Sequence, residues 1–187
     1  MRVMTASGQR GFSLVEVSVV MAIILLMAII GVPVINNFVV ESKVPKVGEQ
    51  LARFVLQAKV NALSGSPTPY RGINTSSLAN SVMGSSIFTV SGREDAPRVL
   101  HGLGTNGEIS VVEQAGGGAF SITLTRVSQA ACPSIASVMQ RVADTIVMGA
   151  DGRAMSVVKD GTVQYSAQSA KSRCARGDVN TVVFTMS

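Results

Sequence analysis

A single carboxylate, Glu16, lies at the beginning of a long apolar stretch near the N-terminus. Val17 to Val40 contains no charged residue, and it is long enough to cross a bilayer as a helix, which takes about 20 apolar residues. A charged group in a membrane helix costs about 2.5–3.5 kcal/mol at mid-bilayer on insertion scales, so it usually marks a function. Near the start of a helix, the dipole and a free amine would partly compensate Glu16. This position therefore predicts a functional carboxylate that needs a positive partner.

The residues before Glu16 complete a longer motif. A short leader that contains Arg2 and Arg10 and no acidic side chain precedes the segment Gly11-Phe12-Ser13-Leu14-Val15-Glu16. This arrangement resembles the processing site and N-terminal helix of type IV pilins. In that family a dedicated peptidase cuts after the glycine, and the new N-terminal residue is methylated. The glutamate then helps to align subunits in a helical filament.

The resemblance implies a role for each of these residues. Gly11 and Phe12 would flank the cut, Phe12 would be N-methylated, and Glu16 would act in filament assembly. Pro33 matches a proline common in these helices. An ordinary signal anchor with a stray glutamate explains the apolar stretch, but neither the Gly-Phe junction nor the proline spacing. A secretory signal peptide is cut after its apolar segment, whereas here the cut would come before it, so the mature protein would keep its hydrophobic helix.

No other group of residues forms an evident catalytic or metal-binding constellation. His101, the only histidine, stands beside Gly102 in a glycine-rich turn, and we predict a surface residue with no catalytic role. Asp151 and Asp160 are expected in turns, far apart in sequence. There is no Cys-x-x-Cys motif, no Cys/His cluster and no phosphate-binding loop that ends in Gly-Lys-Ser/Thr. The sequence therefore predicts no enzyme, no cofactor and no metal site.

The two cysteines, Cys132 and Cys174, suggest a disulfide, because an even count in an exported chain favours pairing. A bridge over a loop of this size would stabilise the fold by about 3–4 kcal/mol on the chain-entropy model. Two unrelated buried thiols are the alternative.

Composition and charge limit the possible partners. The formal net charge of +5 includes the two arginines of the leader. The other basic residues are too dispersed to predict nucleic-acid binding, and two tyrosines with no tryptophan offer little for base stacking. Basic residues before the apolar stretch favour a cytoplasmic N-terminus, although Lys43 and Lys46 soon after it weaken this asymmetry. The bulk of the chain is then expected outside the cytoplasm.

One long helix is expected to carry the motif, from about Phe12 to Leu63. Pro33 should kink it near residues 29–33, and Pro45 should bend it again near Val44. After Pro45 the pattern becomes amphipathic. The apolar stripe consists of Val47, Leu51, Phe54, Val55, Ala58 and Ala62, and we expect most of it to be core.

Shorter elements are predicted beyond a connector that begins at Ser64. Helices are expected near 77–83, at 132–142 and near 167–173, and strands at 87–90, 109–112, 120–126, 145–148, 154–158, 163–165 and 179–184. Asp151-Gly152 and Asp160-Gly161 are expected turns between strands. The predicted fold class is α+β, the type IV pilin fold: a long N-terminal helix packed on an antiparallel β-sheet, with a C-terminal disulfide-bounded region.

A second, weaker resemblance concerns the C-terminal half. Ala119-Phe120, Leu124-Thr125-Arg126 and Ala130-Ala131-Cys132 are similar to the central strand and cysteine-bearing helix of type IVb, bundle-forming-like pilins. In that class the bridge fastens the C-terminal region to the sheet. The short leader and Phe12 are more typical of type IVa pilins. The division expected from both resemblances is a removed leader (1–11), a membrane and filament-core helix (12–41), an amphipathic helix half (42–63) and a globular head (64–187).

The resulting hypothesis is a pilin, the structural subunit of an extracellular type IV pilus that supports adhesion, aggregation or conjugative cell contact. In the filament Glu16 would meet the amine of a neighbouring Phe12, since an unpaired buried charge is strongly penalised. Expected partners are further copies of the chain, the prepilin peptidase, an assembly ATPase, an inner-membrane platform protein and a secretin. The expected location is the inner membrane with a periplasmic head, and then the filament.

Three alternatives stay open. The nearest is a type II secretion pseudopilin or a minor pilin, although the retained cysteines favour a pilin. The second is a DNA- or surface-binding tip module, if the fold gathers scattered basic residues: Arg93, Arg98, Arg141, Arg153, Lys171, Arg173 and Arg176. The third, a membrane-anchored enzyme, is disfavoured because the lone His101 and dispersed carboxylates provide no assembled site.

Overall fold

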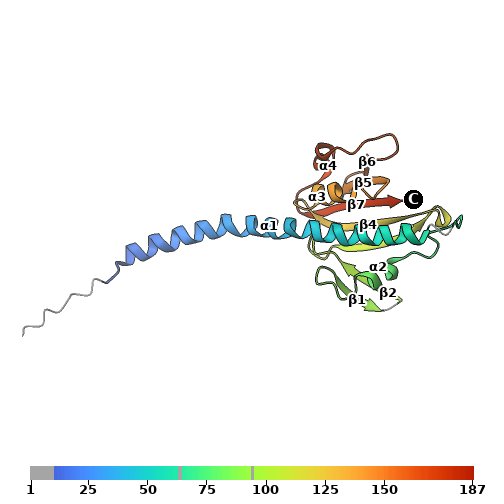
Figure 1. Ribbon diagram of the computed structural model, residues 1–187. Coiled ribbons are helices and arrows are strands. Elements are labelled where there is room, and N and C mark those ends of the chain that lie inside the picture. The colour runs from blue at the N-terminus through green and yellow to red at the C-terminus, as the bar shows by residue number, and fades with distance from the viewer. Residues whose placement is uncertain (1–10, 63–64, 94) are drawn as a thin grey trace, which may run out of the picture. The chain divides into compact units, whose positions relative to one another are not determined.

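The computed structural model describes residues 11–62, 65–93 and 95–187, with the side chains of 32–34 and 36 excepted. The chain forms two compact units, Met1–Asn37 and Phe38–Ser187, which are treated separately below. Helix α1 (Leu14–Ala62) begins in the first unit and ends in the second (Figure 1). The expected helix is therefore confirmed with slightly shorter bounds, while Leu63 lies outside the described residues. The kinks at Pro33 and Pro45 stay predictions.

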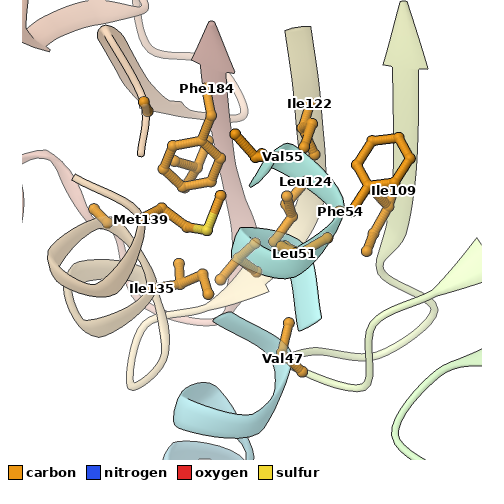
Figure 2. Close-up of a cluster of buried hydrophobic side chains, with 14 of the residues drawn as sticks. Val47, Leu51, Phe54, Val55, Ile109, Ile122, Leu124, Ile135, Met139 and Phe184 are labelled. Carbon is orange, nitrogen blue, oxygen red and sulfur yellow. The ribbon is translucent and has the colours of Figure 1, made fainter. Parts of the chain in front are cut away.

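The second half of α1 contributes one side to the core of the head. Val47, Leu51 and Val55 are completely buried, and Phe54 is nearly so, whereas Glu49 lies on the opposite, exposed side. Figure 2 shows these four apolar side chains among residues from the strands and from a second helix. The predicted stripe is thus confirmed, since burying one apolar face stabilises an amphipathic helix far more than its intrinsic propensity does.

A seven-stranded antiparallel sheet, in the order β1-β2-β3-β4-β7-β5-β6, forms the other side of the core (Figure 1). The strands are β1 (Thr89–Arg93), β2 (Ala96–Leu100), β3 (Glu108–Gln114), β4 (Ala119–Ser128), β5 (Thr145–Ala150), β6 (Ser156–Lys159) and β7 (Asp178–Met186). A short 3-10 turn, η1 (Ala115–Gly117), joins β3 to β4. The hairpin predicted at Asp151-Gly152 is confirmed, because β5 and β6 pair in antiparallel register around it.

Three short helices complete the head. A capping box between Asn74 and Ser77 begins α2 (Thr75–Val82). Pro133 lies in the first turn of α3 (Cys132–Met139), where backbone amides have no partner within the helix, so its missing amide hydrogen costs no hydrogen bond. Ser166 caps α4 (Ala167–Arg173) by accepting a hydrogen bond from the amide of Ser169. All three lie within or close to the predicted ranges.

The strand predictions needed two corrections. The segment 163–165 is not a strand, because the carboxylate of Asp160 accepts hydrogen bonds from the amides of Thr162 and Val163 and holds the chain in a turn. Strand β2 was not predicted, because the signals between Ser64 and Gly104 are weak, and a proline within a strand is itself unfavourable. Pro97 lies outside the part of β2 that pairs with β3, which is limited to Val99 and Leu100.

Candidate functional site

The predicted processing site lies in an open part of the chain. Gly11 and Phe12 are exposed, with 81% of Phe12 accessible. A Cβ added at Gly11 would meet nothing within 4 Å. Helix α1 begins two residues after Phe12, where the Ser13 hydroxyl accepts a hydrogen bond from the amide of Val15 at 3.2 Å. The backbone around the expected cut is therefore free of tertiary contacts in the described residues, as a peptidase substrate must be.

Glu16 lies in the first turn of α1, where its charge faces the positive end of the helix dipole. The exposed side chains of this turn include Leu14 and Val15, so the carboxylate is surrounded by apolar groups of its own helix. No positive partner for Glu16 is present among the described residues. A positive partner from another molecule would offset much of the cost of burying this charge.

The helix that follows Glu16 exposes a continuous apolar surface. Within the described residues, one helix segment, Leu14–Gly31, is long and apolar enough to cross a membrane, and none of it is buried in the structure. Large apolar surfaces that a single chain leaves uncovered mark contact with lipid or with other proteins. This segment therefore fits a membrane anchor before assembly.

The disulfide between Cys132 and Cys174 is confirmed. It joins the first residue of α3 to the residue after α4, with a Cα–Cα distance of 6.0 Å and a sequence separation of 42. On the chain-entropy model, closing this loop stabilises the folded state by about 4 kcal/mol. The bridge fixes the C-terminal region beside the sheet.

Asn180 on β7 holds the same region in place, and sequence reasoning did not identify it. It is fully buried, its Nδ2 donates to the carbonyls of Val127 and Ala175, and its Oδ1 accepts from the amide of Ala175 at 2.6 Å. Since Val182, Phe184 and Met186 are buried at alternate positions, the period of two also directs residue 180 inward. A polar residue at an inward position of an otherwise apolar strand face was the sequence signal that could have identified Asn180.

The prediction for His101 was wrong about its location. The ring is completely buried: Nε2 donates to the carbonyl of Thr125 at 2.9 Å, and Nδ1 accepts from the amide of Leu103 at 3.0 Å. Burial lowers its pKa below the ordinary value, against the opposing effects of the Thr125 carbonyl and the charge of Asp178. His101 is thus a structural residue that fixes the loop between β2 and β3.

Asp144 connects Lys59, near the end of α1, with Ser187, the residue that follows β7. Its Oδ2 accepts from the amide of Ser187 at 2.7 Å and lies 3.5 Å from the ammonium of Lys59. Burial alone would raise the pKa of Asp144, but the hydrogen bonds of Ser187 and the charge of Lys59 hold it below the ordinary value. This contact stabilises the head.

The remaining candidate residues are not gathered into one site. Arg93 and Arg98 lie on β1 and β2 at one edge of the sheet, and Arg98 pairs with Glu108 on β3. Arg153 lies before β6 at the other edge. In the part of the chain that the structure describes, no three His, Cys, Asp or Glu residues are close enough to hold a metal ion together.

Two family models match the chain. The model described as "Prokaryotic N-terminal methylation motif" matches residues 6–32, and the model described as "PilS N terminal" matches residues 56–187. No curated protein matches it. Among solved structures, it is similar to TcpA, a type IV pilin from Vibrio cholerae El Tor biotype, with 14% identity, a TM-score of 0.47, and coverage of 78% of this chain and 99% of that chain.

The first model includes Gly11, Phe12 and Glu16, and the second covers more than half of the chain. The chain therefore belongs to the PilS family, and it is a type IV pilin-like protein with an N-terminal methylation motif.

Proposed function

We propose that this protein is a structural subunit of a type IV pilus, assembled into an extracellular filament after a prepilin peptidase cuts between Gly11 and Phe12. The observation that carries the proposal is the exposed apolar segment Leu14–Gly31, which starts directly after an open Gly-Phe junction and contains Glu16 in its first turn. A head with its own buried core needs no such surface for its stability. The segment is therefore available first to lipid and then to other copies of the chain.

Glu16 sets the stagger between neighbouring subunits in this proposal. After cleavage, the amine of Phe12 is a positive group at the start of the apolar helix, and the Glu16 of a neighbouring copy can lie beside it. Breaking a buried ion pair by removing one partner costs about 3–5 kcal/mol, whereas the intact pair adds little net stability. A wrong stagger leaves a buried charge unpaired, so it is energetically disfavoured.

The remaining assignments follow from this function. Residues 1–11 form the removed leader, 12–41 the membrane and filament-core helix, 42–63 the helix half that packs on the head, and 64–187 the head. The head faces the periplasm before assembly, and an ATPase, an inner-membrane platform protein and a secretin export the filament. The pair Cys132 and Cys174 supports a subunit of the type IVb class in this proposal. Adhesion, aggregation or conjugative contact is its task.

The test is electron microscopy of cells that overexpress the chain, with and without Glu16→Leu. The unchanged chain should give abundant surface fibres that the substitution abolishes, while Glu41→Leu, which removes an exposed carboxylate after the apolar stretch, should leave them intact. The N-terminal mass of subunits from sheared fibres should correspond to a methylated Phe12. Fibres of normal abundance with Glu16→Leu, or mature subunits that still begin at Met1, would refute the proposal.

A further inference from the structure

Two lysines at the start of the head have no part in the proposed filament contacts. Lys43 and Lys46 lie one helical turn apart on α1, and both side chains are exposed. Together they line one side of a groove with a volume of about 440 Å³. The other side consists of residues 86–89, before and at the start of β1, and the loop between β2 and β3. All of this groove belongs to the unit Phe38–Ser187.

The chemistry of the groove favours an anion. Lys43 and Lys46 are its only charged lining residues, and no carboxylate lines it in the described residues. The hydroxyls of Ser86 and Thr89 and the amide of Asn106 add hydrogen-bond donors. The ion pairs of the described residues all involve other groups, so both ammonium groups are available to a ligand. Lysine in such a place binds phosphate oxygens as a point charge.

The loop between β2 and β3, which lies on the other side of the groove, is fixed by buried contacts. Buried His101 fixes it through hydrogen bonds with Thr125 and Leu103. Gly102 adopts a φ of 64°, which a glycine reaches without strain, and a Cβ at that position would lie 3.8 Å from the ammonium of Lys43. The ammonium group and the loop backbone are thus already close together before any ligand binds.

The place of the lysines along α1 distinguishes a lipid headgroup from a soluble phosphate. Lys43 comes three residues after Val40, the last residue of the uncharged stretch, and Lys46 comes three residues later. At about 1.5 Å of rise per residue, the two lysines lie about 4.5 and 9 Å beyond the end of that stretch. The headgroup region of a bilayer extends roughly 5–7 Å beyond each side of the hydrocarbon core. The backbone of Lys43 therefore lies at the depth of the lipid headgroups, and that of Lys46 lies about 2–4 Å beyond it, a gap that a long lysine side chain spans.

We infer that this groove binds the phosphodiester headgroup of an anionic phospholipid while the subunit is anchored in the membrane. The inference rests on the membrane stage of the proposed function and adds a ligand to it. Lys43 and Lys46 contact the phosphate oxygens, and the polar side chains of the opposite wall bind the rest of the headgroup. The subunit gives up this lipid when it enters the filament.

The experiment compares the full chain, in nonionic detergent micelles, with the double variant Lys43→Gln/Lys46→Gln. Binding of a short-chain phosphatidylglycerol is measured by native mass spectrometry, with phosphatidylcholine and inorganic phosphate as separate ligands. The double variant should bind phosphatidylglycerol about thirty-fold more weakly, since each lysine near an anionic lipid surface contributes about 1 kcal/mol. A matched variant, Lys171→Gln/Arg173→Gln, removes two exposed charges from α4 and should bind within two-fold of the unchanged chain.

Each other outcome overturns the inference. Equal binding of both lipids, or an unchanged affinity in the double variant, shows that the groove is not a headgroup site. Binding of inorganic phosphate as tight as that of the lipid assigns the site to a soluble anion. Normal lipid binding with loss of fibres in the double variant assigns the lysines to a contact between subunits. Because lipid binding is measured on the purified chain, its result is independent of whether Glu16→Leu abolishes fibres.

Discussion

Asn180→Ala should destabilise the head more than any other single polar substitution on β7. The side chain of Asn180 is fully buried and joins three segments: β7 itself, the end of β4 at Val127, and the turn at Ala175 that follows the disulfide. Alanine cannot replace any of these contacts. The carbonyl of Val127 would then be left without this donor in a buried position.

The magnitude follows from the hydrogen bonds that are lost. Three of them have distances of 2.6, 2.9 and 3.0 Å. Each contributes about 0.5–1.5 kcal/mol net, and a buried group left unpaired costs about 1–3 kcal/mol. We therefore expect the free energy of unfolding to fall by about 2–4 kcal/mol, a large share of the 5–15 kcal/mol typical of a domain.

The assay is denaturant unfolding of the full, oxidised chain in nonionic detergent, with an unchanged slope required for the comparison. Thr181→Ala is the matched control, because Thr181 is the next residue of β7, lies on the opposite side of the strand and is half-buried. The control should lose less than about 1 kcal/mol. A loss below about 0.5 kcal/mol for Asn180→Ala would refute the reasoning that these hydrogen bonds hold the C-terminal region.

Three further predictions use the same unfolding assay. Replacing both Cys132 and Cys174 by serine should lower the free energy of unfolding by about 4 kcal/mol; an unchanged value would exclude loop closure as the source of stability. Leu51→Ala should lower the free energy of unfolding by about 2–5 kcal/mol, because Leu51 is fully buried. Leu56→Ala, at a site 54% exposed on the same helix, should lower it by less than about 1 kcal/mol, and equal losses in the two variants would contradict the burial pattern. The folded state holds the pKa of His101 below the ordinary 6.5, so the contribution of neutral His101 to stability should be complete above pH 6.5 and be lost as the pH falls toward the folded pKa. His101→Leu should remove that part of the pH dependence of the free energy of unfolding. An identical pH profile in the variant would contradict this reasoning.

The sequence was most informative where one physical constraint acts over many residues. The apolar stripe from Val47 to Val55 follows from helical spacing, and the inward positions of β4 and β7 follow from alternation. The bridge between Cys132 and Cys174 followed from their number and the expected compartment. The helical and strand patterns depend on burial alone, so they can be recognised without knowledge of the partners that cover them.

Other features depend on contacts between segments far apart in the chain. His101 was expected at the surface because of the glycine-rich turn around it, but its Nε2 donates to the carbonyl of Thr125, 24 residues further along the chain, and no local pattern predicts that contact. The predicted strand at 163–165 failed for a local reason instead, because the carboxylate of Asp160 accepts hydrogen bonds from the amides of Thr162 and Val163 and holds a turn there. The groove beside Lys43 likewise arises only when the β2–β3 loop meets α1.

Strand β7 has a consequence for when the head can fold. It pairs with β4 on one side and β5 on the other, and in the described residues it is the only link between the group β1–β4 and the hairpin β5–β6. If the head is exported as proposed, the sheet stays in two separate pieces until residues 178–186 have crossed the membrane. Export would then have to keep the earlier strands from pairing wrongly during that interval, and the proposed subunit would become competent for assembly only when β7 arrives.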